Sequence, residues 1–259
     1  MKTEFITISQ TDNIATLTLN RPDKRNAMHG PLIMECQQAL RLLAESPTRV
    51  LIINGNGENF CAGGDIGHMQ KIAAGSKDDN YRDAQLLADL LYQLYQFPKP
   101  TLVLAHGMTL GGGLGLVAAA DIAIASSNAS FGLPEVKIGL APSMISPYVI
   151  AAIGERMAHY YFLTGERFGA EQAHRIGLIH QLTDETTLMS AGMSVAQILL
   201  QNSPLALQSA KQLMRTVAKQ KITVELAQQT SEHLAELRAT PEAQEGLRAF
   251  MEKRKPRWV

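Results

Sequence analysis

Two glycine-rich segments are the first feature of the sequence with chemical meaning, and each follows an apolar run. They read FCAGGDI at residues 60–66 and GMTLGGG at residues 107–113. Glycine permits positive φ and close approach to a ligand, and such a loop before a helix leaves backbone N–H groups without acceptors. Two loops of this kind on neighbouring strands can direct one N–H each at a single oxygen, as in an oxyanion hole. The alternative is that both segments are merely tight strand-to-helix turns.

Glu135 is the second candidate group. It lies between Pro134 and Val136 in a segment that otherwise reads as buried. A buried carboxylate is costly unless it has a role or a partner, so Glu135 is a candidate functional group. The structural alternative is an ion pair with a nearby lysine. His68 and His106, which flank the glycine segments, are predicted to be structural.

A dinucleotide-binding loop is a competing interpretation of the second glycine segment. Residues 113–118 match G-x-G-x-x-A, and Glu135 follows at a plausible distance for an acid that binds ribose. However, residues 108–112 separate this motif from the end of the preceding strand, and Glu135 follows a proline instead of ending a strand. The sequence therefore disfavours a nicotinamide oxidoreductase.

Short apolar strands alternate with helices over the first two thirds of the chain. The predicted strands are residues 5–8, 15–19, 50–53, 102–105 and 122–125. Apolar residues at helical spacing predict a helix that opens at Pro31, one that carries Leu87 to Leu94, and one that ends at Ala120. This alternation is typical of an α/β domain.

From about Thr186 the strands vanish and only helices are predicted. They cover residues 188–200, 204–217 and 222–238, and a last helix has Thr240 as its N-cap and Pro241 in its first turn. We therefore expect two domains, an α/β core at residues 1–185 and a helical C-terminal region at residues 186–259.

The composition restricts the class of protein. The 259 residues are 46% hydrophobic, and 24 Lys and Arg balance 24 Asp and Glu, whereas a nucleic-acid binder normally needs a clustered basic surface. The sequence shows no secretory signal and no apolar run of membrane-spanning length. Cys36 and Cys61 fit no disulfide or metal pattern. We expect a cytoplasmic protein without membrane or nucleic-acid partners.

Five motifs in order resemble the enoyl-CoA hydratase (crotonase) superfamily. They are Asn20-Arg21-Pro22 with Asn26-Ala27-Met28, FCAGGDI at 60–66, HGMTLGGGLGL at 106–116, ADIAIA at 120–125 and FGLPEVKIGLAP at 131–142. The resemblance covers nearly the whole chain. It implies a spiral of ββα units with a helical C-terminal oligomerisation region, assembled as a trimer or dimer of trimers.

The resemblance also implies roles for individual residues. The N–H groups of Gly64 and Gly112 match the oxyanion pair that polarises the carbonyl of an acyl-CoA thioester. The substrate-binding residues would be Ala62, Gly64, Asp65, Ile66, Gly67 and Gly112. Glu135 matches the second of the two glutamates with which hydratases hold and deprotonate water. No metal or cofactor is implied beyond the coenzyme A of the substrate.

One departure from the family pattern concerns the other glutamate, because its position is Gly115 here. A single glutamate at the position of Glu135 is also what Δ3,Δ2-enoyl-CoA isomerases show. Residues 139–154 and 240–258, however, look most like bacterial methylglutaconyl-CoA hydratases. We therefore expect hydration of a 2-enoyl-CoA, with 3-methylglutaconyl-CoA or a related branched thioester as the substrate. Isomerisation, or an RNA-binding or scaffold role on the same fold, are the alternatives.

Overall fold

A computed structural model describes residues 3–218 and 220–259, and its main sheet has six strands in the order β1-β2-β3-β4-β6-β9. Every neighbouring pair is parallel except β1 with β2. Asp12 and Asn13 join those two strands with φ of 49° and 66°, the left-handed geometry that a tight hairpin requires. The two strands that it joins confirm those predicted at residues 5–8 and 15–19. The strands are β1 (Ile6–Thr11), β2 (Ile14–Leu19), β3 (Val50–Gly55), β4 (Thr101–Ala105), β6 (Ile122–Ser126) and β9 (Gln181–Thr183).

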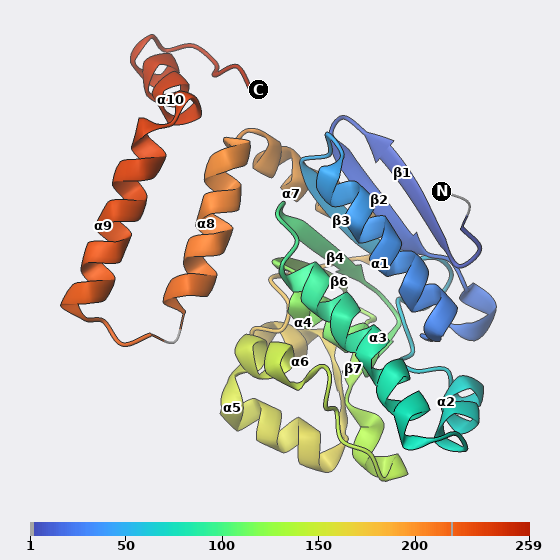
Figure 1. The fold of residues 1–259 in the computed structure, drawn as a ribbon. Helices are drawn as coiled ribbons and strands as arrows, with labels where there is room; N and C mark the ends of the chain where they lie inside the picture. The colour runs from blue at the N-terminus through green and yellow to red at the C-terminus, as the bar shows by residue number, and fades with distance from the viewer. Residues whose placement is uncertain (1–2, 219) are drawn as a thin grey trace.

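Helices cover both faces of this sheet (Figure 1), as a mostly parallel sheet requires. Alternate residues of β3 point to opposite sides: Leu51 and Ile53 belong to the main apolar core, whereas Val50 and Ile52 pack in a second core with α7. The main core is shared with helices α1 (Gly30–Glu45), α3 (Lys77–Tyr95), α4 (Gly112–Ala119) and α5 (Ser146–Thr164), and α7 is Leu188–Leu200.

A smaller sheet of three short strands follows the second glycine segment and was not predicted from the sequence. It pairs β5 (Met108–Leu110) in parallel with β7 (Ser130–Gly132), and β7 antiparallel with β8 (Arg167–Gly169). Residues 108–110, expected to be loop, are therefore strand. The other elements before α7 are helices α2 (Ile66–Ala73) and α6 (Ala170–Arg175) and the short 3-10 helices η1 (Pro22–Lys24), η2 (Pro134–Ile138) and η3 (Glu185–Thr187).

Helices α8 (Pro204–Val217) and α9 (Val224–Ala239) form a hairpin that extends away from the sheet, and α10 (Pro241–Met251) follows (Figure 1). Thr240 caps α10 by accepting a hydrogen bond from the N–H of Ala243, as predicted. The fold class, α/β with a helical C-terminal region, is confirmed. The division into two domains at residue 185 stays a prediction.

A partly buried ion pair attaches α8 to the sheet. Lys211 Nζ donates to Asp121 Oδ2 at 2.5 Å and to the carbonyl of Lys99 at 2.9 Å. Asp121 Oδ2 also accepts from the N–H and the hydroxyl of Thr101, each at 2.8 Å. Burial lowers the pKa of Lys211, and the charge of Asp121 opposes that shift. The pair therefore links helix α8 to the ends of β4 and β6.

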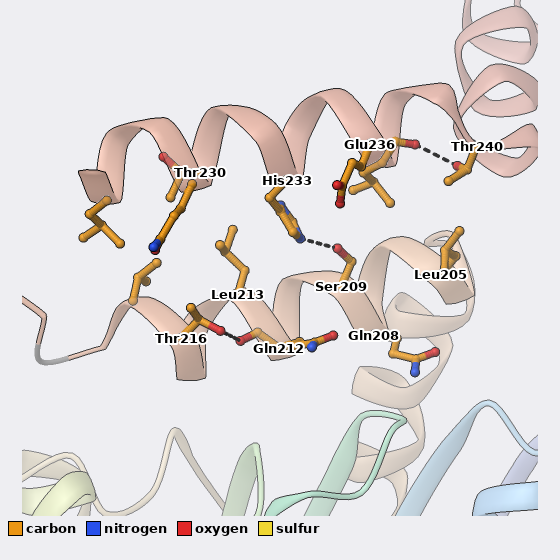
Figure 2. A pocket seen from close by; sticks show the side chains of 14 residues that line it. Leu205, Gln208, Ser209, Gln212, Leu213, Thr216, Thr230, His233, Glu236 and Thr240 are labelled. Carbon is orange, nitrogen blue, oxygen red and sulfur yellow. Dashed lines mark hydrogen bonds between the residues drawn. The ribbon is translucent and has the colours of Figure 1, made fainter. Parts of the chain in front are cut away.

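A groove of about 430 Å³ lies between α8 and α9. Figure 2 shows its side chains, among which the Ser209 hydroxyl lies 2.7 Å from His233 Nε2. None of the predicted site residues lines this groove. In the part of the chain that the structure describes, no helix is long and apolar enough to span a membrane.

Candidate active site

The two glycine segments are in direct contact. Cys61 pairs with β5, since its N–H donates to Met108 at 3.1 Å and its carbonyl accepts from Leu110 at 3.0 Å. Gly63 has φ of +95° and Gly111 has φ of +47°, conformations that favour glycine. The position that a β-carbon at Gly63 would take lies 3.9 Å from the Cα of Gly111. Gly64 and Gly112, the next residue in each segment, are thereby brought together.

Both Gly64 and Gly112 have backbone N–H groups that find no acceptor among residues 3–218 and 220–259. On either side of Gly64, Met28 donates to the Gly63 carbonyl at 2.7 Å and accepts from Asp65 at 2.8 Å. This parallel pairing does not use the N–H of Gly64 itself. Gly112 is the first residue of α4, where an N–H has no acceptor within its own helix. Two adjacent free donors suit a carbonyl oxygen that gains negative charge.

Methionine sulfur lies against both glycines. A β-carbon at Gly64 would be 2.8 Å from Met69 Sδ, and one at Gly112 would be 2.8 Å from Met28 Sδ. Any side chain at either position would therefore displace a thioether. Neither methionine was predicted to be a site residue, because the spacing of a methionine does not distinguish core from site. Their apolar surface lowers the local dielectric, which strengthens hydrogen bonds made by the two donors.

Asp65 holds the first glycine segment in place. Its Oδ1 accepts from the N–H of His68 at 3.0 Å, which caps α2, and its Oδ2 accepts from Arg21 Nη1 at 2.7 Å. The N–H of His68 and the guanidinium of Arg21 lower the pKa of Asp65. Arg21 also donates to the carbonyl of Ala27 at 3.1 Å. Asp65 is therefore the N-cap of α2, and its contact with the substrate stays a prediction.

Both histidines that flank the glycine segments have structural partners, as predicted. His68 Nε2 lies 2.6 Å from Asp83 Oδ1 on α3. His106 Nε2 lies 2.9 Å from the carbonyl oxygen of Gly57.

Glu135 approaches the second glycine segment from η2. Its Oε1 lies 3.0 Å from the position that a β-carbon at Gly111 would take. Its Oε2 is buried without a hydrogen-bond partner, and the described residues form no ion pair with it. Burial raises the pKa of Glu135. The lysine partner considered from the sequence is therefore absent from the described chain.

The glycines of the apparent dinucleotide motif face protein atoms. A β-carbon at Gly113 would lie 2.7 Å from Cys61 Cβ, and one at Gly115 would overlap Ile145 Cγ2. Both glycines lie within α4 and not at the end of a strand. They therefore serve close packing of the helix, not approach to a pyrophosphate.

The remaining predicted binding residues lie beside Gly64. The N–H of Ala62 donates to the Arg25 carbonyl at 3.0 Å. Ile66 and Gly67 open α2 and are exposed, with 60% of the Ile66 surface accessible. Their contact with a ligand stays a prediction. Among residues 3–218 and 220–259, no three His, Cys, Asp or Glu side chains group in a way that would hold a metal ion.

Comparison with known proteins agrees with this geometry. Residues 9–259 match the family model described as enoyl-CoA hydratase/isomerase. The chain belongs to this family. The expected spiral fold is confirmed by a crystal structure of an enoyl-CoA hydratase from Shewanella pealeana, which is 40% identical with a TM-score of 0.96 over 98% of this chain and 96% of that one.

Curated members of the enoyl-CoA hydratase/isomerase family match the chain over almost its full length. The 2,3-dehydroadipyl-CoA hydratase of Escherichia coli is 33% identical over 96% of this chain and 96% of its own. An enoyl-CoA isomerase/hydratase of Mycosarcoma maydis is 34% identical over 93% of this chain and 90% of its own. The names of these relatives include both hydration and isomerisation.

Proposed function

We propose that this enzyme adds water to the double bond of a 2-enoyl-CoA thioester. The observation that carries the proposal is the Glu135 carboxyl group, whose Oε2 is buried without a hydrogen-bond partner among the described residues, near the free N–H groups of Gly64 and Gly112. The thioester carbonyl oxygen accepts from both donors. As water adds to Cβ, negative charge moves onto this oxygen, and the donors stabilise the enolate.

Glu135 carries the protons in this mechanism. As a carboxylate it takes one proton from water while the water oxygen bonds to Cβ, and the π electrons move toward the carbonyl. The resulting carboxylic acid then gives its proton to Cα, so the carboxylate is regenerated and the atoms of one water are added. A pKa raised by burial suits a group that acts first as base and then as acid.

We further propose that the acyl group is 3-methylglutaconyl or a related branched chain. The support is the likeness of residues 139–154 and 240–258 to methylglutaconyl-CoA hydratases. A substrate that carries its own carboxylate can take over part of the role of a second acid in the site.

Isomerisation of a 3-enoyl-CoA is the second candidate function. It is favoured by the packing of Ile145 against Gly115, which leaves no space for a second acid on that face of α4. A single carboxyl group is enough to move a proton between two carbons.

Product analysis separates the two functions. The protein is incubated with crotonyl-CoA, 3-methylglutaconyl-CoA and a 3-enoyl-CoA, with the Glu135→Gln variant as the control. Hydration of 3-methylglutaconyl-CoA that is lost in the variant supports the proposal. Efficient shift of the 3-enoyl double bond without hydration of either 2-enoyl thioester contradicts it and favours the isomerase.

We also propose that the chain assembles as a trimer or a dimer of trimers. Helix α10 exposes the apolar side chains of Leu247, Phe250 and Met251, of which 51%, 85% and 82% of the surface is accessible. Exposed apolar surface of this kind is typical of an interface. Light scattering after size exclusion should give a mass three or six times that of one chain, and a monomer would contradict the proposal. The cytoplasmic location and the absence of a cofactor stay predictions.

A further inference from the structure

Two glycines, one just before helix α4 and one within it, are each covered by a different side chain. Gly111, which precedes the helix, and Gly115 are one turn apart, since the N–H of Gly115 donates to the carbonyl of Gly111 at 2.9 Å. Glu135 lies over Gly111 and Ile145 lies over Gly115. Ile145 therefore packs against α4 one turn beyond the residue that Glu135 covers.

Ile145 fills this position with the rigid part of its side chain. A β-carbon at Gly115 would overlap Ile145 Cγ2 and would lie 3.2 Å from Ile145 Cβ, and Leu91 Cδ1 would be 3.4 Å away. Ile145 is the N-cap of α5, its carbonyl accepts from Tyr148 and Val149, and only 2% of its surface is accessible. A β-branched side chain has little freedom at χ1. The side chain of Ile145 therefore cannot move aside without a cost in free energy.

We propose that Ile145 and Gly115 form a coupled pair that determines substrate specificity. Ile145 holds the space from which a second carboxylate on α4 would reach the water bound by Glu135. It thereby limits this face of α4 to one acid. Substrates whose hydration depends on two carboxylates are turned over slowly. This inference rests on the proposed function.

The contact with Cγ2 provides matched variants. Ile145→Leu removes Cγ2 and keeps the volume, whereas Ile145→Val keeps Cβ and Cγ2 and loses only Cδ1. Gly115→Ala should lower Tm, and Ile145→Leu should recover most of that loss while Ile145→Val recovers none. Gly115→Glu combined with Ile145→Leu should hydrate crotonyl-CoA at least about ten times faster than Gly115→Glu combined with Ile145→Val.

Two outcomes would overturn the pairing. One is a Gly115→Ala protein with the Tm of the wild type, because the overlap would then cost nothing. The other is equal recovery of Tm by Ile145→Leu and Ile145→Val. The Tm measurements involve no substrate, so they test the pairing even if the wild-type protein proves not to be a hydratase. Failure of the proposed function appears separately, as absence of hydration of any 2-enoyl-CoA by the wild type.

Discussion

The carboxyl group of Glu135 lies over Gly111, with its Oε1 3.0 Å from the position that a β-carbon there would take. Residue 111 must be glycine for two reasons. A β-carbon would meet the Glu135 carboxyl group, and the φ of +47° is one that favours glycine. The carboxyl group thus reaches the start of α4, next to the N–H of Gly112.

Replacing Glu135 by Gln should abolish proton transfer without changing the shape of the site. We expect turnover to fall by about 10²–10⁴, the range typical of a positioned acid–base group. The KM for the thioester should change little, because the oxyanion donors remain. Steady-state kinetics of Glu135→Gln should be compared with Glu155→Gln, a substitution of an exposed residue on α5. Equal activity of the two variants would remove Glu135 from the mechanism.

The same substitution should change how stability depends on pH. Burial raises the pKa of Glu135 above its ordinary value of 4.5, so the folded state holds this proton more tightly than the unfolded state. Below about pH 4.5 Glu135 is protonated in both states, so the folded state carries no penalty for a buried charge. As pH rises through the folded pKa the penalty of a buried charge develops. The Tm of Glu135→Gln relative to wild type should therefore increase from pH 4 to pH 8, and a difference independent of pH would contradict the shift.

The oxyanion donors can be tested only by removing an N–H. Gly112 is the first residue of α4, a position that tolerates proline. A β-carbon there would press on Met28 Sδ, so the test uses a Met28→Ala background. Gly112→Pro, which lacks the donor, should then lose about 10²–10³ in turnover relative to Gly112→Ala, which keeps it. Circular dichroism should first show both variants folded, and equal turnover would refute the role of this N–H.

Removing Lys211 should loosen the attachment of α8. Lys211→Met leaves the Asp121 carboxylate with the two hydrogen bonds from Thr101, and we expect a loss of about 1–3 kcal/mol in the free energy of unfolding. Adding Asp121→Asn removes the charge left without its partner. Urea titration should therefore show that the double variant loses less than the sum of the single losses. Additive losses would mean that the two side chains do not interact in solution.

Several parts of the fold follow from the sequence because their signals are local. The strands of the main sheet are short apolar runs between turn residues, and the capping role of Thr240 follows from the proline after it. The glycine segments could be recognised because a turn that leaves N–H groups free needs backbone conformations that favour glycine. The smaller sheet escaped prediction since strands of three residues give no periodicity.

The environment of the glycines was not predictable. Ile145 meets Gly115 across 30 positions of the chain, and Met69 reaches Gly64 from a helix that the sequence did not indicate. The sequence shows that Gly115 replaces the glutamate of the family pattern, but only the packing shows which side chain fills the space beside it. Helix α5 also lacked a clear signal, because Gly154 interrupts it with φ of +74°.

The ion pair between Asp121 and Lys211 has a consequence for synthesis of the chain on the ribosome. The two residues are 90 positions apart, so at about 5–20 residues per second Asp121 precedes its cation by roughly 5–18 s. Over most of that time strands β1 to β6 have been made and β9 follows, while the Asp121 carboxylate lacks its counter-charge. The core therefore reaches its final stability only after α8 has been made, and a chain truncated before Lys211 should be a target for proteolysis.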